Sequence, residues 1–188
     1  MDDPDPKFFS LEEVEITLTA LLNSRHYSDF IPYHAIGFFA GIRPEETARL
    51  TWNSVKLDGD NPYVFVSGDC SKTHYKRNVY LSDNLFHWLQ WWKSTFPRLP
   101  LIPKRDHKEA LTRFRRRLPF NWIHDGMRHS YATYHLAKHS NLDLLEDQTG
   151  TAKHTLKRHY IDRTTKEAAE KYWSIMPTED GKRVVVGN

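Results

Sequence analysis

The feature that most constrains the fold is an amphipathic pattern in the middle of the chain. Large apolar residues recur there at helical spacing, at Leu85, Trp88, Leu89, Trp92 and Phe96. This spacing places them on one face of a helix, which Ser82 or Asp83 can cap. Burial requires such a helical period, so we interpret this aromatic stripe as core rather than as a platform for stacking bases.

Helix signals recur along the rest of the chain. Ser10 and Glu13 form a capping box, which predicts a helix to about Leu22. Pro32 opens a more apolar helix, and Gly41 ends it. Further helices are expected at residues 125–138, 141–149, 152–159 and 164–176.

Three short runs predict strands instead of helices. They occupy residues 55–57, 63–66 and 77–81, and a turn signal at residues 58–62 separates the first two. The predicted fold class is therefore α+β, mainly α-helical with a small antiparallel β-sheet. The length of 188 residues is that of one domain with a sizeable core.

Composition excludes several kinds of site. Cys70 is the one cysteine, so no disulfide can form within the chain, and the 11 histidines show no spacing typical of zinc ligands. No apolar run reaches membrane-spanning length. We therefore expect no metal, no cofactor, no membrane contact and a cytoplasmic setting. The formal net charge of +3 is too small to identify a nucleic-acid partner by itself.

Arg43 lies where one predicted helix stops and another begins. Gly41 ends the first helix, and Pro44 suits the first turn of the next. The guanidinium and the unpaired N–H groups of the new helix can therefore face the same anion. The alternative is an ordinary surface ion pair between Arg43 and Glu46.

Positive charge gathers in three segments. The densest lies at residues 104–117, where only Asp106 and Glu109 offset it. Such a run is either a solvated helix face or a contact to the DNA backbone, and we expect the contact. The candidate DNA-binding residues are Lys76, Arg77, Arg113, Arg115, Arg116, Arg117, Lys153 and Lys157.

Three separated blocks follow one another in the chain, at residues 40–52 around Arg43, at residues 71–81 from Ser71-Lys72-Thr73, and at residues 127–133 around Arg128. In this order they resemble the catalytic domain of tyrosine recombinases, the phage-integrase family. Residues 40–52 resemble the family's Gly-Leu-Arg-x-x-Glu box, and residues 71–81 resemble its hairpin lysine and the strand that follows. Residues 127–133 contain an Arg-His-Ser segment similar to the family's second arginine block. The resemblance covers about residues 10–177.

The resemblance implies a role for each site residue. Tyr160, at the family's distance from Gly150, would attack a scissile phosphodiester and form a 3′-phosphotyrosyl bond. Arg43 and Arg128 would clamp the phosphate, and Lys72 would protonate the leaving 5′-oxygen. Because the covalent intermediate conserves the bond energy, the implied reaction needs neither metal nor ATP.

Two positions depart from the family pattern. Asp125 stands three residues before the second arginine, where the family commonly has histidine, and Thr151 stands where it commonly has histidine or tryptophan. Asp125 can accept a proton from Tyr160, although neighbouring arginines weaken a carboxylate as a base. His124 is the alternative base. Thr151 can donate one hydrogen bond to the phosphate but lacks the bulk of indole.

The resemblance also implies the organisation of the protein. We expect a flexible segment at residues 1–9, a catalytic domain at residues 10–177 and a tail at residues 178–188, without the family's N-terminal core-binding domain. The implied partner is double-stranded DNA, bound as a tetramer in a bacterial or phage nucleoid setting, with a monomer for the isolated domain. Three functions stay open: a site-specific recombinase or integrase, a topoisomerase or resolvase relative, and a catalytically degenerate DNA-binding module of a mobile element.

Overall fold

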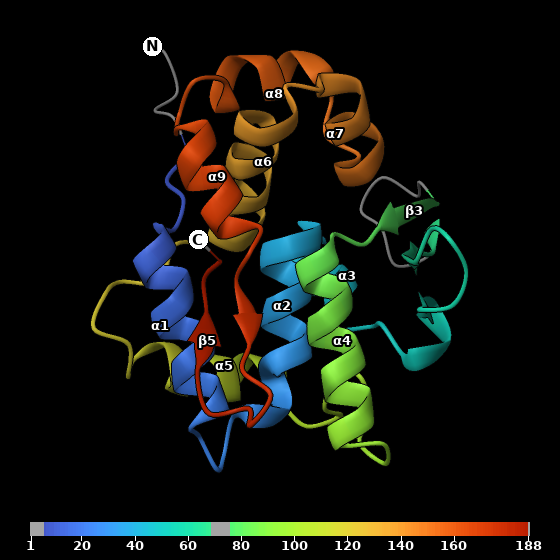
Figure 1. The fold of residues 1–188 in the computed structure, drawn as a ribbon, viewed down its shortest axis with the longest axis vertical. Helices are drawn as coiled ribbons and strands as arrows, with labels where there is room; N and C mark the ends of the chain where they lie inside the picture. The colour runs from blue at the N-terminus through green and yellow to red at the C-terminus, as the bar shows by residue number, and fades with distance from the viewer. Residues whose placement is uncertain (1–5, 69–75, 188) are drawn as a thin grey trace.

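The computed structural model describes residues 6–68 and 76–187 of the chain (Figure 1). Its α-helices are α1 (Leu11–Leu22), α2 (Ile31–Ala40), α3 (Pro44–Thr47), α4 (Asp83–Thr95), α5 (His107–Arg115), α6 (Gly126–His139), α7 (Leu142–Thr149), α8 (Lys153–Tyr160) and α9 (Lys166–Tyr172). Its strands are β1 (Val55–Lys56), β2 (Tyr63–Val66), β3 (Arg77–Tyr80), β4 (Met176–Pro177) and β5 (Val184–Val185). Two 3₁₀ turns complete these elements: η1 (Ser28–Phe30) precedes α2, and η2 (Trp52–Ser54) precedes β1. The predicted fold class, mainly α with a small antiparallel sheet, is confirmed.

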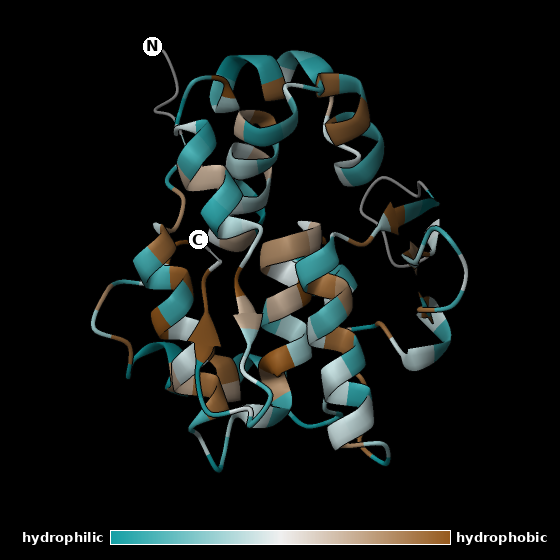
Figure 2. Cartoon of the chain, in the orientation of Figure 1, coloured by the Kyte–Doolittle hydropathy of each residue, from teal (hydrophilic) through white to brown (hydrophobic). Residues whose placement is uncertain are grey.

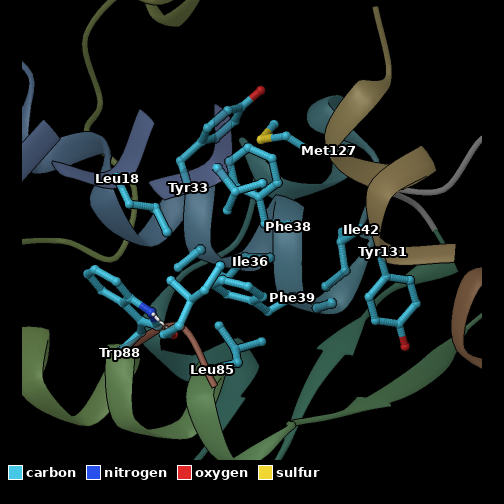
Figure 3. Close-up of a cluster of buried hydrophobic side chains, with 14 of the residues drawn as sticks. Leu18, Tyr33, Ile36, Phe38, Phe39, Ile42, Leu85, Trp88, Met127 and Tyr131 are labelled. Atoms are coloured by element: carbon cyan, nitrogen blue, oxygen red, sulfur yellow. Dashed lines mark hydrogen bonds between the residues drawn. The ribbon is translucent and has the colours of Figure 1, made fainter. Parts of the chain in front are cut away.

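Helix α2 lies at the centre of the fold. All its residues are buried, as expected for a helix covered by other elements on every side. Helix α4 packs its aromatic stripe against α2, and Leu85 and Trp88 are fully buried there (Figure 3). Trp88 Nε1 also donates a hydrogen bond to the carbonyl oxygen of Ile175 at 3.0 Å. The stripe is therefore core, except that Phe96, after the last turn of α4, is 36% exposed.

Two glycines allow α6 to lie close to α2. A Cβ atom on Gly37 would lie 2.7 Å from the sulfur of Met127, and one on Gly41 would lie 2.3 Å from the ring of Tyr131. Gly41 also has a φ of +60°, a left-handed conformation that glycine adopts without steric cost. Met127 and Tyr131 flank Arg128, so this packing brings Arg128 beside the end of α2.

The hydropathy of the helices agrees with the central position of α2. Figure 2 shows the central helix α2 in apolar and neutral colours and α8 as largely hydrophilic. In α8, Leu156 and Tyr160 are buried while the lysines and arginines are exposed. Among the helices of the described residues, none is long and apolar enough to cross a membrane.

The three-stranded sheet has the order β1-β2-β3 and is antiparallel throughout. Val64 pairs with Val55 on one side and with Val79 on the other, and all three side chains are buried. Alternation puts Phe65 and Tyr80 on the exposed face. The sheet places Arg77, the first residue of β3, with its side chain on the buried face next to α7.

Both terminal segments contact the rest of the domain. The segment predicted as flexible at residues 1–9 ends in the core, because Phe9 is fully buried and its N–H donates to Ser130 Oγ at 2.8 Å. At the other end, β5 pairs with β4 in register Pro177↔Val184, and β5 packs against α1. The C-terminal tail is therefore held against the domain through β5.

Candidate active site

A buried ion pair joins the helix after Arg43 to the sheet. Both oxygens of the Glu46 carboxylate accept hydrogen bonds from Arg77, at 2.6 and 3.2 Å, and both residues are at most 5% exposed. Burial alone would raise the pKa of Glu46, but its hydrogen bonds and charge interaction with Arg77 hold that pKa below its ordinary value. Arg77 Nε also donates to the carbonyl oxygen of Gln148, so Arg77 connects α3, β3 and α7.

Arg43 is the N-cap residue of α3. Its backbone N–H donates to Glu46 Oε2 at 3.2 Å, which fixes the turn between α2 and α3. Its Nη1 lies 3.7 Å from Glu46 Oε1, too far for a hydrogen bond, and has no hydrogen-bond partner among the described residues although it is buried. The predicted pair with Glu46 exists, but Glu46 is already engaged by Arg77. Arg43 therefore keeps hydrogen-bonding capacity for another acceptor.

Arg128 lies in the first turn of α6 and is 8% exposed. Its Nη1 donates to the carbonyl oxygen of Gly41 at 2.7 Å, and its Nη2 donates to that of Thr149 at 2.7 Å and to Thr151 Oγ1. Burial and the positive charges of Arg43 and Arg77 lower the pKa of Arg128 to about 10. The guanidinium is therefore held in one orientation, in an environment that carries excess positive charge.

Thr151 follows Gly150, which ends α7 in a left-handed conformation with a φ of +65°. The Thr151 hydroxyl accepts a hydrogen bond from Arg128, and its backbone N–H donates to Thr149 Oγ1 at 3.2 Å. A hydroxyl that accepts one hydrogen bond can still donate its own proton. Thr151 thus positions Arg128 and keeps the donor that the sequence predicts for it.

Tyr160 is the last residue of α8 and is 8% exposed. Its hydroxyl forms a 2.6 Å hydrogen bond with His129 Nδ1, and the two rings stack with centroids 5.9 Å apart. Burial raises the pKa of Tyr160, while the nearby charge of Arg128 opposes that shift. The structure therefore brings the predicted nucleophile, and one of the two predicted clamp arginines, to the same end of α6.

His129 is the site residue that the sequence pattern does not reveal. Its position directly after Arg128 is compatible with a structural role, and its partner Tyr160 lies 31 residues away in the sequence. The spacing of a histidine and a tyrosine across two helices carries no periodic signal. The Arg-His-Ser segment itself is the one feature of the sequence that marks His129.

Asp125 and His124, the two predicted proton acceptors that precede α6, take no part in the hydrogen bond between Tyr160 and His129. Asp125 is the N-cap residue of α6 in a left-handed conformation, with a φ of +52° and no capping hydrogen bond. Its carboxylate lies 3.5 Å from Nδ1 of His124, whose side chain is 98% exposed. Both affect the charge around His129 without being hydrogen bonded to Tyr160 in the described part of the chain.

A cleft of about 650 Å³ opens beside Arg128. Ile42 and Met127 line its apolar side, and Asp125 and Lys108 contribute charged groups. The cleft gives a ligand in solvent a route to the otherwise buried Arg128. Within residues 6–68 and 76–187, no three histidine, cysteine or acidic side chains are grouped as metal ligands.

Comparison with solved structures decides the fold. XerA recombinase superposes with a TM-score of 0.67 over 89% of this chain and 64% of that one, at 15% identity. The catalytic domain of bacteriophage HP1 integrase gives 0.59 over 82% and 87%, at 21% identity. XerH recombinase bound to its difH substrate gives 0.58 over 81% of this chain and 49% of that one, at 18% identity.

The fold is that of a tyrosine recombinase catalytic domain. No protein-family model matches the sequence, and no curated protein sequence matches it either. The chain spans about half the length of XerH. In this fold Arg43 is the N-cap residue of α3, Arg128 lies in the first turn of α6 and Tyr160 is the last residue of α8. Lys72, expected in the hairpin between β2 and β3, lies outside the described residues, as does Cys70.

The predicted DNA-binding residues separate into two groups. Lys76, Arg113, Arg116, Arg117, Lys153 and Lys157 are exposed. Within this group Arg113 pairs with Glu109, Lys153 pairs with Asp143, and Arg117 lies over the ring of Tyr27. The second group comprises Arg77, which is buried, and Arg115, which is half-buried and lines the cleft beside Arg128.

One of the expected DNA contacts therefore needs correction. Arg77 is buried, and its donors are directed at Glu46 and Gln148, so its side chain braces the site instead of reaching DNA. Arg115 is half-buried with its guanidinium carbon 4.4 Å from the ring centre of Trp122. The sequence places Arg77 in a basic run, but its orientation depends on Glu46 and Gln148, which lie 31 and 71 positions away.

Proposed function

We propose that this chain cleaves and rejoins DNA through a covalent bond between Tyr160 and a 3′-phosphate. The observation that carries the proposal is that Tyr160, hydrogen bonded to His129, lies near the fixed guanidinium of Arg128 in a recombinase fold, with Arg43 on the other side of that guanidinium's charge environment. Tyr160, Arg43 and Arg128 would act together in this reaction. Each supplies a property that phosphoryl transfer requires.

The phosphate would bind where positive charge is in excess. Arg43 and Arg77 both interact with the carboxylate of Glu46, and after burial, which is the larger cause, their repulsion also lowers the pKa of Arg128. A phosphodiester in the cleft beside Arg128 would relieve that repulsion. It would also accept a hydrogen bond from the unpaired Nη1 of Arg43 and one from the Thr151 hydroxyl.

The reaction then follows from the placement of the nucleophile. Tyr160 Oη attacks phosphorus, a bond from phosphorus to the tyrosine oxygen forms, and the bond to the 5′-oxygen breaks. Charge that develops on the non-bridging oxygens is stabilised by Arg43 and Arg128. Lys72 remains the proposed donor of the proton that the 5′-oxygen takes up. The reverse attack, by a 5′-hydroxyl from another strand, releases Tyr160 and completes strand exchange.

Recombination also requires the chain to hold DNA and to assemble. XerH is described in complex with its difH substrate before and after cleavage, and we propose an equivalent duplex partner here. The exposed basic residues of α5 and α8 are the proposed contacts to its backbone, with electrostatic attraction as the main force. Assembly as a tetramer on DNA, in a bacterial or phage nucleoid, belongs to the same proposal.

A second candidate is a DNA-binding module that no longer cleaves. It is favoured by Asp125 and Thr151, which stand where recombinases commonly have histidine or an aromatic residue. Thr151 is also already engaged with Arg128. This module would bind duplex DNA in a salt-sensitive way and would bind equally well after Tyr160→Phe.

A covalent-capture experiment separates the two candidates. The chain is incubated with a pool of duplexes that carry random sequence around one nick, so that a cleaved strand loses a short fragment and the adduct is trapped. We expect an adduct that survives denaturation for the wild type and none for Tyr160→Phe. Tyr80→Phe, a change at a 50% exposed tyrosine on the sheet, is the matched control and should behave as wild type. Salt-sensitive binding without an adduct would establish the second candidate instead.

A further inference from the structure

The hydroxyl of the proposed nucleophile is already bound to a base. Tyr160 Oη and His129 Nδ1 lie 2.6 Å apart, and the interplanar angle of the rings is 29°. The pair joins the first turn of α6 to the last turn of α8, so it is fixed by two packed helices. His129 comes from the same turn as Arg128, which is oriented by three hydrogen bonds of its own.

We infer that His129 is a catalytic residue, the general base that removes the proton from Tyr160 as its oxygen attacks phosphorus. This inference rests on the proposed function and adds to it a role that the sequence assigned to Asp125 or His124. The geometry fits the role because a general base must lie within hydrogen-bond reach of the proton it takes. Asp125 and His124 do not form such a bond with Tyr160 among the described residues.

The environment keeps His129 in the form that can accept a proton. Its pKa is lowered by burial and by the positive charges of Arg128, His124 and His159, and Asp125 opposes that shift. A neutral imidazole with its proton on Nε2 presents a lone pair on Nδ1 to the tyrosine hydroxyl. These groups, with Arg163 near Tyr160 itself, are the charges that face the pair from α6, α8 and their adjoining loops.

Substrate binding makes His129 a stronger base. The phosphodiester brings a negative charge to Arg128, and this offsets the repulsion that disfavours an imidazolium. The proton then moves from Tyr160 Oη to His129 Nδ1 as the bond from phosphorus to the tyrosine oxygen forms. The leaving 5′-oxygen takes its proton from a separate donor. On reversal the imidazolium returns the proton to Tyr160, so the base is regenerated in each cycle.

Three substitutions separate proton transfer from positioning. His129→Ala removes both the hydrogen bond and the base. In His129→Asn the side-chain carbonyl can take the place of Nδ1 as an acceptor, but it does not bind a proton near neutral pH. Asp125→Asn tests the carboxylate in the same way. All three are compared with wild type in single-turnover adduct formation on duplexes captured from the nicked pool.

The expected result has a distinct pH dependence. Both His129 variants should lose about 10²-fold in rate at pH 7, the usual contribution of a general base. The loss should shrink as pH rises, because hydroxide ionises Tyr160 directly. Wild-type behaviour of His129→Asn at every pH would reduce His129 to a positioning residue and overturn the inference. A pH-dependent loss in Asp125→Asn, with His129→Ala unaffected, would transfer the role to Asp125.

A substrate with a 5′-bridging sulfur distinguishes the base from the acid. A thiolate leaves without protonation, so the substitution should rescue a defect in the proposed proton donor, Lys72→Ala. It should leave the His129→Ala defect in place, because Tyr160 still has to lose its proton. Rescue of His129→Ala by the sulfur substrate would contradict the inference.

An NMR measurement that needs no catalysis tests the role of His129 separately from the proposed function. The ¹⁵N resonances of His129 report its tautomer in the free protein, and the inference requires Nε2–H with an accepting Nδ1 whose shift changes in Tyr160→Phe. If this shift changes as expected but the wild type forms no adduct, the proposed function fails while the contact stands. If the wild type forms the adduct but the His129 chemical shifts do not change in Tyr160→Phe, the inference alone fails.

Discussion

The carboxylate of Glu46 and the guanidinium of Arg77 form a two-pronged ion pair that is almost completely buried, with the shorter bond at 2.6 Å. The two residues are 31 positions apart and join α3 to β3. Arg43 caps α3 and therefore depends on this pair for its position. Removing one partner leaves the other charge buried and uncompensated.

We predict that Glu46→Gln destabilises the protein by about 3–5 kcal/mol, the usual cost of breaking a buried ion pair from one side. Chemical unfolding in urea measures the change. Glu167→Gln, which removes an exposed pair with Lys171 on α9, is the control and should leave the urea midpoint unchanged. Equal midpoints for both variants would show that the Glu46–Arg77 pair is not a structural brace.

The same ion pair makes stability depend on pH. Because the pKa of Glu46 is lower in the folded than in the unfolded chain, its contribution is fully present above the unfolded value of about 4.3 and is lost as pH falls through the folded value. As pH falls below about 5, the free energy of unfolding of the wild type should therefore decrease more than that of Glu46→Gln. Parallel stability profiles in acid for the two proteins would contradict this assignment.

Arg128→Lys tests whether the phosphate clamp needs a guanidinium. An ammonium cannot span Gly41, Thr149 and Thr151 as the three donor contacts of Arg128 do. We expect adduct formation to fall by about 10²–10³-fold, the typical effect of removing one transition-state donor. Arg98→Lys, at an exposed position, should be neutral. A rate within a few-fold of wild type for Arg128→Lys would argue against the clamp.

Thr151 should act through its oxygen. Thr151→Val keeps the shape of the side chain but removes the acceptor for Arg128, a hydrogen bond to a charged group worth about 1.5–3 kcal/mol. Adduct formation should then fall by roughly 10–100-fold, while Thr151→Ser stays close to wild type. Single-turnover rates measure both variants. A wild-type rate for Thr151→Val together with a loss in Thr151→Ser would mean that the methyl group, rather than the hydroxyl, matters.

Gly41 and Gly150 form a matched pair of left-handed glycines. Alanine at Gly150 meets no atom within 4 Å, so it should cost only the backbone strain of about 1–2 kcal/mol. Alanine at Gly41 adds an overlap with the ring of buried Tyr131, so it should cost about 1–3 kcal/mol more. Thermal unfolding of the two variants measures the difference. Equal melting temperatures would show that α2 and α6 are less closely packed than described.

Charge reversal at Arg116, directly after α5, tests whether the exposed basic residues there contact DNA. Arg116→Glu should weaken binding to all duplex sequences alike and reduce the salt dependence of the affinity, because fewer counterions are released. Fluorescence anisotropy at several salt concentrations measures both effects. Lys171→Glu on α9 is the control for net charge. If the two variants bind with the same affinity and salt slope, α5 does not contact the backbone.

Local signals in the sequence are sufficient for most of the helices. The Ser10–Glu13 capping box is present as predicted, since both of its hydrogen bonds lie within one turn. Gly41 ends α2 because a left-handed residue is needed there. The alternation of apolar residues within each strand likewise accounts for the burial of Val64 and Val79. These features depend on residues within a few positions of one another, so pattern alone defines them.

The site itself is only partly predictable. Arg43, Arg128 and Tyr160 follow from motifs, but the inward orientation of Arg77 depends on a buried carboxylate 31 residues away. The His129–Tyr160 bond likewise depends on how α6 and α8 pack. Neither contact has a sequence period, because each forms between elements whose separation is set by the whole fold.

The most direct test of the central claim is to locate the covalent bond. The trapped protein–DNA adduct is digested with nuclease and protease, and the nucleotide-bearing peptide is sequenced by mass spectrometry. We predict a nucleotide joined through its 3′-phosphate to the oxygen of Tyr160. An adduct at any other residue, or a wild-type chain that binds the duplex pool and forms no adduct, would contradict the claim that Tyr160 cleaves DNA.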